Sequence, residues 1–248
     1  MVRILIALVI AMSVPAGAQN PEQTLIAAAG KGDLAAVERL IRGGASVFAR
    51  GGGGRTALLA ATRGNHVAVA RALIAAGANV NAKDDIEDSP FLYAGAEGRN
   101  EILKMALAAG ADVNAKDNIE DSPYLYAGAE GRNEILKMTL PTADLKSTNR
   151  YGGTALIPAA HHGHPEAVRI LLGTAIDKDH VNKLGWTALL EAVILGNGGP
   201  VHTGIVRLLV EAGANVNIAD RDGVTPLTHA KRHGYAAMAR MLEARGAR

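Results

Sequence analysis

The segment VNAKDDIEDSPFLYAGAEGRNEILKMAL occupies residues 80–107, and VNAKDNIEDSPYLYAGAEGRNEILKMTL occupies residues 113–140. The first copy begins at Val80 and the second at Val113. A short fixed period, here about 33 residues, is typical of proteins that stack one small unit on the next. The doubled segment therefore predicts a repeat architecture. The copies differ at three of 28 positions, which pair Asp85 with Asn118, Phe91 with Tyr124, and Ala106 with Thr139.

The same unit can be followed in both directions from the doubled segment. It opens with a residue, usually Ser or Thr, whose side chain would cap the helix formed by the Ala-rich apolar run that follows. A glycine-containing break and a second helix with apolar residues at helical spacing come next. Another glycine and an extended turn, such as residues 80–84, close the unit. Seven units fit residues 19–248, with starts near Gln23, Thr56, Ser89, Ser122, Thr154, Thr187 and Thr225.

Composition and the absence of motifs exclude several classes of function. The chain of 248 residues has a net charge of +2 with neutral histidines, so no general attraction to nucleic acid or to an anionic membrane is expected. It contains no cysteine, which excludes disulfides, thiol catalysis and thiolate metal sites. Neither a G-x-S-x-G motif nor a glycine-spaced calcium loop is present. We therefore expect no catalytic residue, no metal site and no cofactor.

The start of the chain, MVRILIALVIAMSVPAGAQN (1–20), has the layout of a secretory signal peptide. Arg3 gives a basic start, residues 4–14 are apolar, and small residues after Pro15 form an A-x-A cleavage site. The apolar run is too short for a comfortable membrane span. We predict a signal peptide at residues 1–18, cleavage after Ala18 and export of residues 19–248 to a bacterial periplasm, with no membrane contact afterwards. The alternative is an envelope scaffold anchored by an uncleaved N-terminal segment.

The openings and closings of these units resemble those of ankyrin repeats, which are helix–turn–helix units of about 33 residues. The likeness is strongest in TALLAATRGNHVAVARALIAAGANVNAKD (56–84) and AGANVNIADRDGVTPLTH (212–229). The chain is also similar to exported bacterial ankyrin proteins that carry LYAGAEGR, NRYGGTALIPAA and LGWTALLEA blocks. The resemblance implies an all-α solenoid of about seven ankyrin repeats joined by hairpin-like turns. It further implies a monomeric, non-enzymatic module that binds a protein partner, with a loose link to oxidative-stress defence.

In ankyrin proteins the hairpin tips and the inner faces of the first helices line a concave groove. Carried over by position, this implies a groove that is acidic in the middle and basic and aromatic towards the C-terminus. Exposed apolar and aromatic residues in a charged surround are typical of interface centres. The implied groove residues are Arg55, Asp85, Ile86, Asp88, Glu97, Asn118, Ile119, Asp121, Glu130, Arg150, Tyr151, His161, His162, Lys183, Leu184, Trp186, Ile194, Arg221, Val224, Arg232 and His233.

A group of histidines allows a metal-binding alternative, because imidazoles bind transition metals. The group consists of His161, His162 and His164, with His202 in the next unit. A histidine at the start of the second helix is ordinary in ankyrin repeats, and no carboxylate follows at a ligand spacing. We therefore favour surface and capping roles for these side chains.

The carboxylates of the hairpin tips are open to water, so we expect a solvated acidic face or a partner contact there.

Two further expectations concern how the hairpins attach to the helices. Tyr93 and Tyr126 recur at one register, and we expect both in the core with hydroxyls that find a local bond. In the ankyrin opening TPLH, the histidine ties the hairpin down. Leu59 and its equivalents stand at that position here, so we expect the hairpins to be held more by apolar contact.

Overall fold

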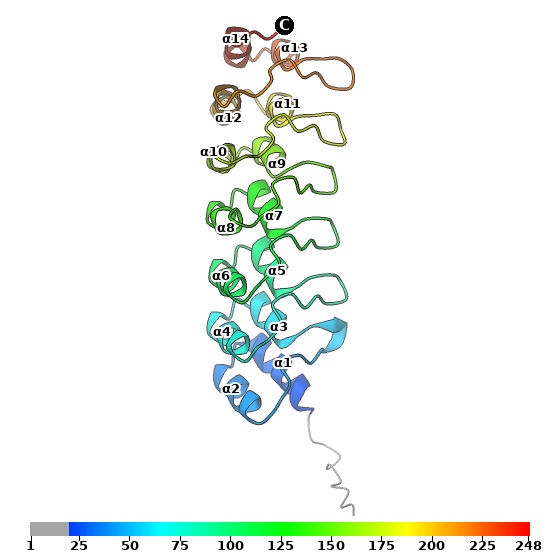
Figure 1. Ribbon diagram of the computed structural model, residues 1–248, viewed down its shortest axis with the longest axis vertical. Coiled ribbons are helices and arrows are strands. Elements are labelled where there is room, and N and C mark those ends of the chain that lie inside the picture. The colour runs from blue at the N-terminus through cyan, green and yellow to red at the C-terminus, as the bar shows by residue number, and fades with distance from the viewer. Residues whose placement is uncertain (1–19) are drawn as a thin grey trace, which may run out of the picture.

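The computed structural model describes residues 20–248, and these residues form fourteen α-helices in seven pairs (Figure 1). The predicted signal peptide lies outside the described residues. The first helices of the pairs are α1 (Pro21–Lys31), α3 (Ala57–Arg63), α5 (Pro90–Ala96), α7 (Pro123–Ala129), α9 (Leu156–His161), α11 (Ala188–Ile194) and α13 (Pro226–Arg232). The second helices are α2 (Leu34–Arg42), α4 (Val67–Ala75), α6 (Asn100–Ala108), α8 (Asn133–Thr139), α10 (Pro165–Leu172), α12 (Pro200–Glu211) and α14 (Ala236–Ala244).

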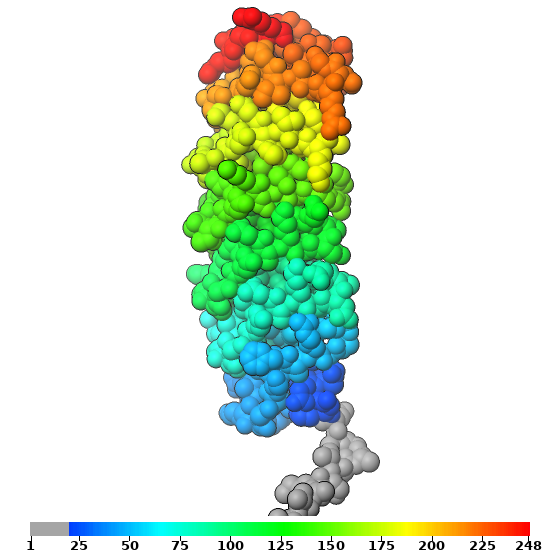
Figure 2. Space-filling view, turned by 45° about the vertical axis from the view of Figure 1, so that its right-hand side comes forward, coloured from blue at the N-terminus to red at the C-terminus, as the bar shows by residue number. Residues whose placement is uncertain are grey.

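The seven pairs stack into one elongated body. The first helices contact one another in order from α1 to α13, and the second helices do so from α2 to α14. Figure 1 shows these as two columns, with the hairpins projecting beside the first helices. In Figure 2 the colours follow one another along the long axis, as expected when each unit contacts its neighbours in sequence. The predicted all-α solenoid is therefore confirmed.

Regular structure other than α-helix is sparse in residues 20–248. A short 3-10 helix, η1 (Gly52–Gly54), lies in the hairpin before α3, next to an isolated antiparallel bridge between Arg50 and Thr56. None of the helices described is long and apolar enough to cross a membrane.

Capping side chains explain where most first helices begin. In five units the predicted hydroxyl accepts a hydrogen bond of 3.1–3.3 Å from the N–H group three residues on. Two units differ from this prediction. Asn20 caps α1, which begins before Gln23, and the buried hydroxyl of Thr154 has no hydrogen-bond partner. The five confirmed caps are Thr56, Ser89, Ser122, Thr187 and Thr225.

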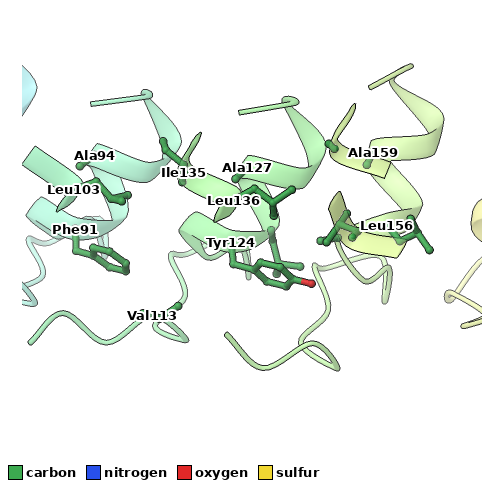
Figure 3. Close-up of a cluster of buried hydrophobic side chains, with 14 of the residues drawn as sticks. Phe91, Ala94, Leu103, Val113, Tyr124, Ala127, Ile135, Leu136, Leu156 and Ala159 are labelled. Carbon is green, nitrogen blue, oxygen red and sulfur yellow. The ribbon is translucent and has the colours of Figure 1, made fainter. Parts of the chain in front are cut away.

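The hydrophobic core runs through the whole stack and consists mostly of Ala, Leu, Val and Ile. Phe91 and Tyr124, at equivalent positions of the doubled segment, are its largest fully buried side chains, and Figure 3 shows them below successive helix pairs. Close approach of α5 and α7 depends on a small residue at the contact. A Cβ on Gly95 would lie 2.3 Å from Cβ of Pro123, so a larger side chain there would push the two units apart.

Candidate functional site

Five hairpins are each held by an Asp or Asn side chain at their base. Its Oδ1 atom accepts hydrogen bonds of 2.9–3.1 Å from the N–H groups two and four residues on. The expectation that apolar contact holds these hairpins is therefore wrong. The sequence signal for this arrangement is the recurrence of Asp or Asn at one register of five successive units. The five residues are Asp84, Asp117, Asn149, Asn182 and Asp220.

The second polar atom of this side chain often ties the hairpin to the first helix that follows. The partner then lies nine residues on, on the face of the helix that is turned to the groove. Three such pairs form, at 3.0, 2.8 and 2.7 Å: Asp117 with Tyr126, Asn182 with Glu191, and Asp220 with His229.

The two tyrosines expected in the core lie on the hairpin side of the first helices instead. Both are half-buried. The hydroxyl of Tyr126 donates to Asp117, and burial, followed by that carboxylate, raises the pKa of Tyr126. Tyr93 is covered by Arg63, whose guanidinium carbon lies 5.3 Å from the ring centre. The core prediction is wrong because this register faces the hairpin rather than the second helix, whereas the expected local bond of the hydroxyl is confirmed for Tyr126.

A hollow of about 490 Å³ lies along α7, α9 and α11 on the hairpin side of the stack. Its lining includes apolar, polar and charged side chains, and binding sites usually combine apolar walls with a few polar groups. Sequence reasoning missed several lining residues, notably Tyr126, Asn149, Asn182, Glu191 and Leu195. The hollow brings together seven predicted groove residues: Asp121, Glu130, Arg150, Tyr151, His161, His162 and Leu184.

The wall of the hollow contains a buried carboxylate. Glu191 is 5% exposed, its Oε1 accepts a hydrogen bond from Asn182, and Nδ1 of His161 lies 3.6 Å from its Oε2. Burial raises the pKa of Glu191 to about 7, against the smaller opposing effect of Asn182. Burial also lowers the pKa of His161, with His162 and His202 adding to the effect. The sequence signal for this site is a single carboxylate in an otherwise apolar helix, and it does not show that Glu191 is buried against the hairpin.

The end of the hollow formed by the fourth unit is acidic. Asp121 and Glu130 line it, and burial, followed by the charge of Asp117, raises the pKa of Asp121 to about 6. The guanidinium of Arg150 also lines the hollow, with its central carbon 4.9 Å from the centre of the Tyr151 ring. The hollow therefore combines carboxylates with an exposed aromatic ring and one cation.

Four successive hairpin tips form an apolar row, and the last two of its side chains line the hollow. Ile86 and Ile119 lie at the tips before α5 and α7, and Tyr151 and Leu184 lie at the two that follow. Ile86, Tyr151 and Leu184 are about half exposed, which is unusual for large apolar side chains. The row ends at the last hairpin, where the equivalent residue is Asp222.

The other predicted groove residues lie outside the hollow. In the third unit, Asp88 is paired with Arg63, and Glu97 is exposed at the end of α5. Trp186 is half-buried, and its backbone N–H donates to Asn182 at the hairpin base. Arg55, Asp85, Asn118, Arg232 and His233 are exposed, and Ile194 and Val224 are half-buried. Two tip cations bridge successive hairpins through backbone carbonyls: Lys183 donates to Arg150, and Arg221 donates to Lys183.

Two histidines of the metal-binding alternative make hydrogen bonds between units. His162 bonds the carbonyl of Ala129 at 2.7 Å, and His202 bonds the carbonyl of His161 at 2.9 Å. In residues 20–248 no group of three or more His, Asp or Glu side chains is arranged to hold a metal ion. The imidazoles of His162 and His202 therefore connect one unit to the next.

Comparison with known proteins places the chain in a family. The family model described as "Ankyrin repeats (3 copies)" matches residues 24–117, 124–220 and 176–248. The chain belongs to the ankyrin repeat family. Ankyrin repeat domains typically act as protein–protein interaction modules and generally lack enzymatic activity, so the resemblance inferred from the sequence is confirmed at this level.

Relatives of this ankyrin repeat protein include bacterial ones. The putative ankyrin repeat protein YahD of Escherichia coli (strain K12) is 43% identical over 105 residues, which are 42% of this chain and 52% of YahD. The chain thus spans about half the length of that relative. The crystal structure of an ankyrin repeat domain from Acinetobacter baumannii AYE shares 48% identity at a TM-score of 0.62, covering 90% of this chain and 98% of that one. The ankyrin repeat protein EF0377 shares 35% identity at a TM-score of 0.68, covering 90% and 97%.

Proposed function

We propose that this ankyrin repeat protein is a non-enzymatic module that binds a partner protein along the groove between hairpin tips and first helices. The observation that carries the proposal is the row of apolar tips, Ile86, Ile119, Tyr151 and Leu184, beside a hollow with charged walls. Apolar and aromatic anchors next to a pocket, surrounded by polar groups, are the usual composition of an interface centre.

Affinity capture followed by mass spectrometry tests the proposal. We expect the wild-type protein to recover a partner, and the double variant Tyr151→Ala with Leu184→Ala to recover much less of it. A matched control changes two exposed residues of the second helices, Lys104→Ala and Arg207→Ala, and should recover as much partner as the wild type. Equal recovery by the groove variant and the wild type would contradict binding at this surface.

We also propose that the protein acts outside the cytoplasm, in the bacterial periplasm. The support is the basic, apolar and small-residue pattern of residues 1–18. The intact mass of the exported protein is the test: a chain beginning at Gln19 is expected, and a chain that retains residues 1–18 would favour the anchored scaffold instead. A role in oxidative-stress defence would appear as reduced peroxide survival of a strain lacking the gene, restored by the wild type and not by the groove variant.

A further inference from the structure

The first copy of the doubled segment binds a guanidinium from the preceding unit. Nη2 of Arg63, at the end of α3, lies 3.0 Å from Oδ2 of Asp84 and 3.0 Å from Oδ2 of Asp88. The same guanidinium covers the ring of Tyr93. Charge-assisted bonds to carboxylates together with contact to an aromatic face suit the planar guanidinium group. The acidic and aromatic site at this hairpin is thus filled by a side chain from the preceding unit.

The second copy keeps this site and lacks its cation. Asp117, Asp121 and Tyr126 are the equivalents of Asp84, Asp88 and Tyr93, and the equivalent of Arg63 one unit on is Ala96. No Lys or Arg of residues 20–248 forms an ion pair with Asp117 or Asp121. Oδ2 of Asp117 instead accepts the hydroxyl of Tyr126. The half-buried carboxylate of Asp121 therefore has no ion pair of the kind that Asp88 makes with Arg63, although the charges of Arg150 and Lys116 partly oppose the rise in its pKa.

The unfilled site opens into the hollow. Asp121 and Tyr126 line it together with Glu130, and Glu191 lies further along the same wall. The one guanidinium on the wall, that of Arg150, already lies over the ring of Tyr151. An accessible volume of about 490 Å³ leaves room for a side chain as large as arginine.

We infer that the end of the hollow formed by Asp121, Tyr126 and Glu130 binds the guanidinium of an arginine side chain on the partner protein. This inference rests on the proposed function and names the chemistry of the segment that the groove would bind. Arginine is favoured over lysine because its planar group can bond a carboxylate while it stacks on a ring, as Arg63 does in the preceding unit. An extended segment would place this arginine in the hollow and its apolar residues on the neighbouring tips.

Peptide selection on the protein, residues 19–248, tests the inference. A displayed library of random linear peptides of about 12 residues is selected on the wild-type protein. The best binder is then synthesised with arginine, lysine or citrulline at the position of interest, and Kd is measured by fluorescence anisotropy. Citrulline keeps the shape of arginine and removes its charge. We expect a shared arginine among the selected peptides, and a loss of about 10-fold or more in affinity on its replacement by citrulline.

Three variants locate the arginine. Asp121→Asn should weaken binding of the arginine peptide. It should also reduce the citrulline penalty, which is the loss of affinity when citrulline replaces arginine, to about 2-fold or less, because the carboxylate that bonds the guanidinium is gone. Ala96→Arg should also weaken binding of the arginine peptide, because the new side chain would itself occupy the site, as Arg63 does at the equivalent site of the preceding hairpin. Asp88→Asn is the matched control and should leave the citrulline penalty unchanged, since Arg63 already fills that site.

The outcomes separate this inference from the proposed function. Two results would overturn the arginine site and leave groove binding intact. In the first, the peptides need Tyr151 for binding but show no preference for arginine. In the second, the citrulline penalty persists in both Asp121→Asn and Ala96→Arg. If no peptide binds the wild-type protein in a manner that depends on Tyr151, both the site and the peptide-binding groove are contradicted.

Discussion

Asn182 donates a hydrogen bond of 2.8 Å from Nδ2 to Oε1 of Glu191, and both residues are buried at the wall of the hollow. Oδ1 of the same asparagine accepts the N–H groups of Leu184 and Trp186. One side chain thus fixes the hairpin tip and orients a buried carboxylate on the helix behind it. The charge state of that carboxylate is therefore tied to the stability of the fold.

The substitution Glu191→Gln should change how stability depends on pH. Burial raises the pKa of Glu191 from 4.5 to about 7, so its contribution is fully present below about pH 4.5 and is lost as pH rises through 7. Gln does not ionise, so the variant should gain unfolding free energy relative to the wild type between about pH 4 and pH 8, by up to roughly 3 kcal/mol. Urea unfolding at both pH values measures this.

The exposed carboxylate Glu101 supplies the control for that comparison. The difference in unfolding free energy between Glu101→Gln and the wild type should change much less between the same two pH values, because an exposed carboxyl is not desolvated on folding. If Glu191→Gln and the wild type differ by the same amount at both pH values, the buried ionisation is not coupled to folding.

The buried hydroxyl of Tyr124 predicts a stabilising substitution. It has no hydrogen-bond partner, whereas the equivalent Phe91 fills the same space without a polar atom. Because an unpaired buried hydroxyl is unfavourable, Tyr124→Phe should raise the unfolding free energy by about 1 kcal/mol, and Phe91→Tyr should lower it by a similar amount. Thermal or urea unfolding gives the comparison. A clear loss of stability in Tyr124→Phe would show that the hydroxyl is satisfied.

The tips of the doubled units hold a glutamate in a backbone conformation that favours glycine. Glu87 and Glu120 have φ values of 67° and 66°, and their equivalents in the last two hairpins are Gly185 and Gly223. Glu120→Gly should therefore raise the unfolding free energy by up to about 1 kcal/mol, because the left-handed region penalises a Cβ. A second glycine substitution, Lys104→Gly within α6, should lower it by about 1 kcal/mol. Destabilisation by both changes would contradict the strain assigned to the tip.

Removal of one copy of the doubled segment should leave a folded protein. Deleting residues 85–117 joins Asp84 to Asn118, and the retained Asp84 can make the same hairpin bonds that Asp117 makes now. Each unit contacts mainly its neighbours, so six units remain a continuous stack. Circular dichroism and a cooperative unfolding transition measure the outcome. An unfolded product would mean that the register assigned to the units is wrong.

Much of the fold could be predicted because local signals agree with the period. The doubled segment establishes the spacing of the units, and Ser or Thr before Ala-rich runs marks five first helices. Thr154 shows where this reasoning stops, since its hydroxyl has the expected chemistry and makes no cap. Whether a capping bond forms at Thr154 depends on the backbone geometry there, which cannot be read from the residue pattern.

The candidate site was less accessible to sequence reasoning because it depends on contacts between units. Position alone brought Asp121, Arg150 and Tyr151 into the groove, and the structure places all three around one hollow. Glu191 looked like part of an apolar helix, and only its partner on the preceding hairpin shows that it is a buried carboxylate facing the groove. The difference between Arg63 and Ala96 likewise matters only because Arg63 forms an ion pair with Asp84 on the next hairpin, a contact that the sequence does not show.

Site-specific photo-crosslinking tests most directly whether a partner protein binds on the hairpin side of the stack. A photoreactive phenylalanine analogue is placed at Tyr151, at the edge of the hollow, or at Lys104, on the second helix α6. In cells producing either protein, we predict that illumination yields a discrete adduct with a partner protein from position 151 and little or none from position 104. An adduct that forms only from position 104, or equally from both positions, would show that the partner protein does not bind specifically on the hairpin side.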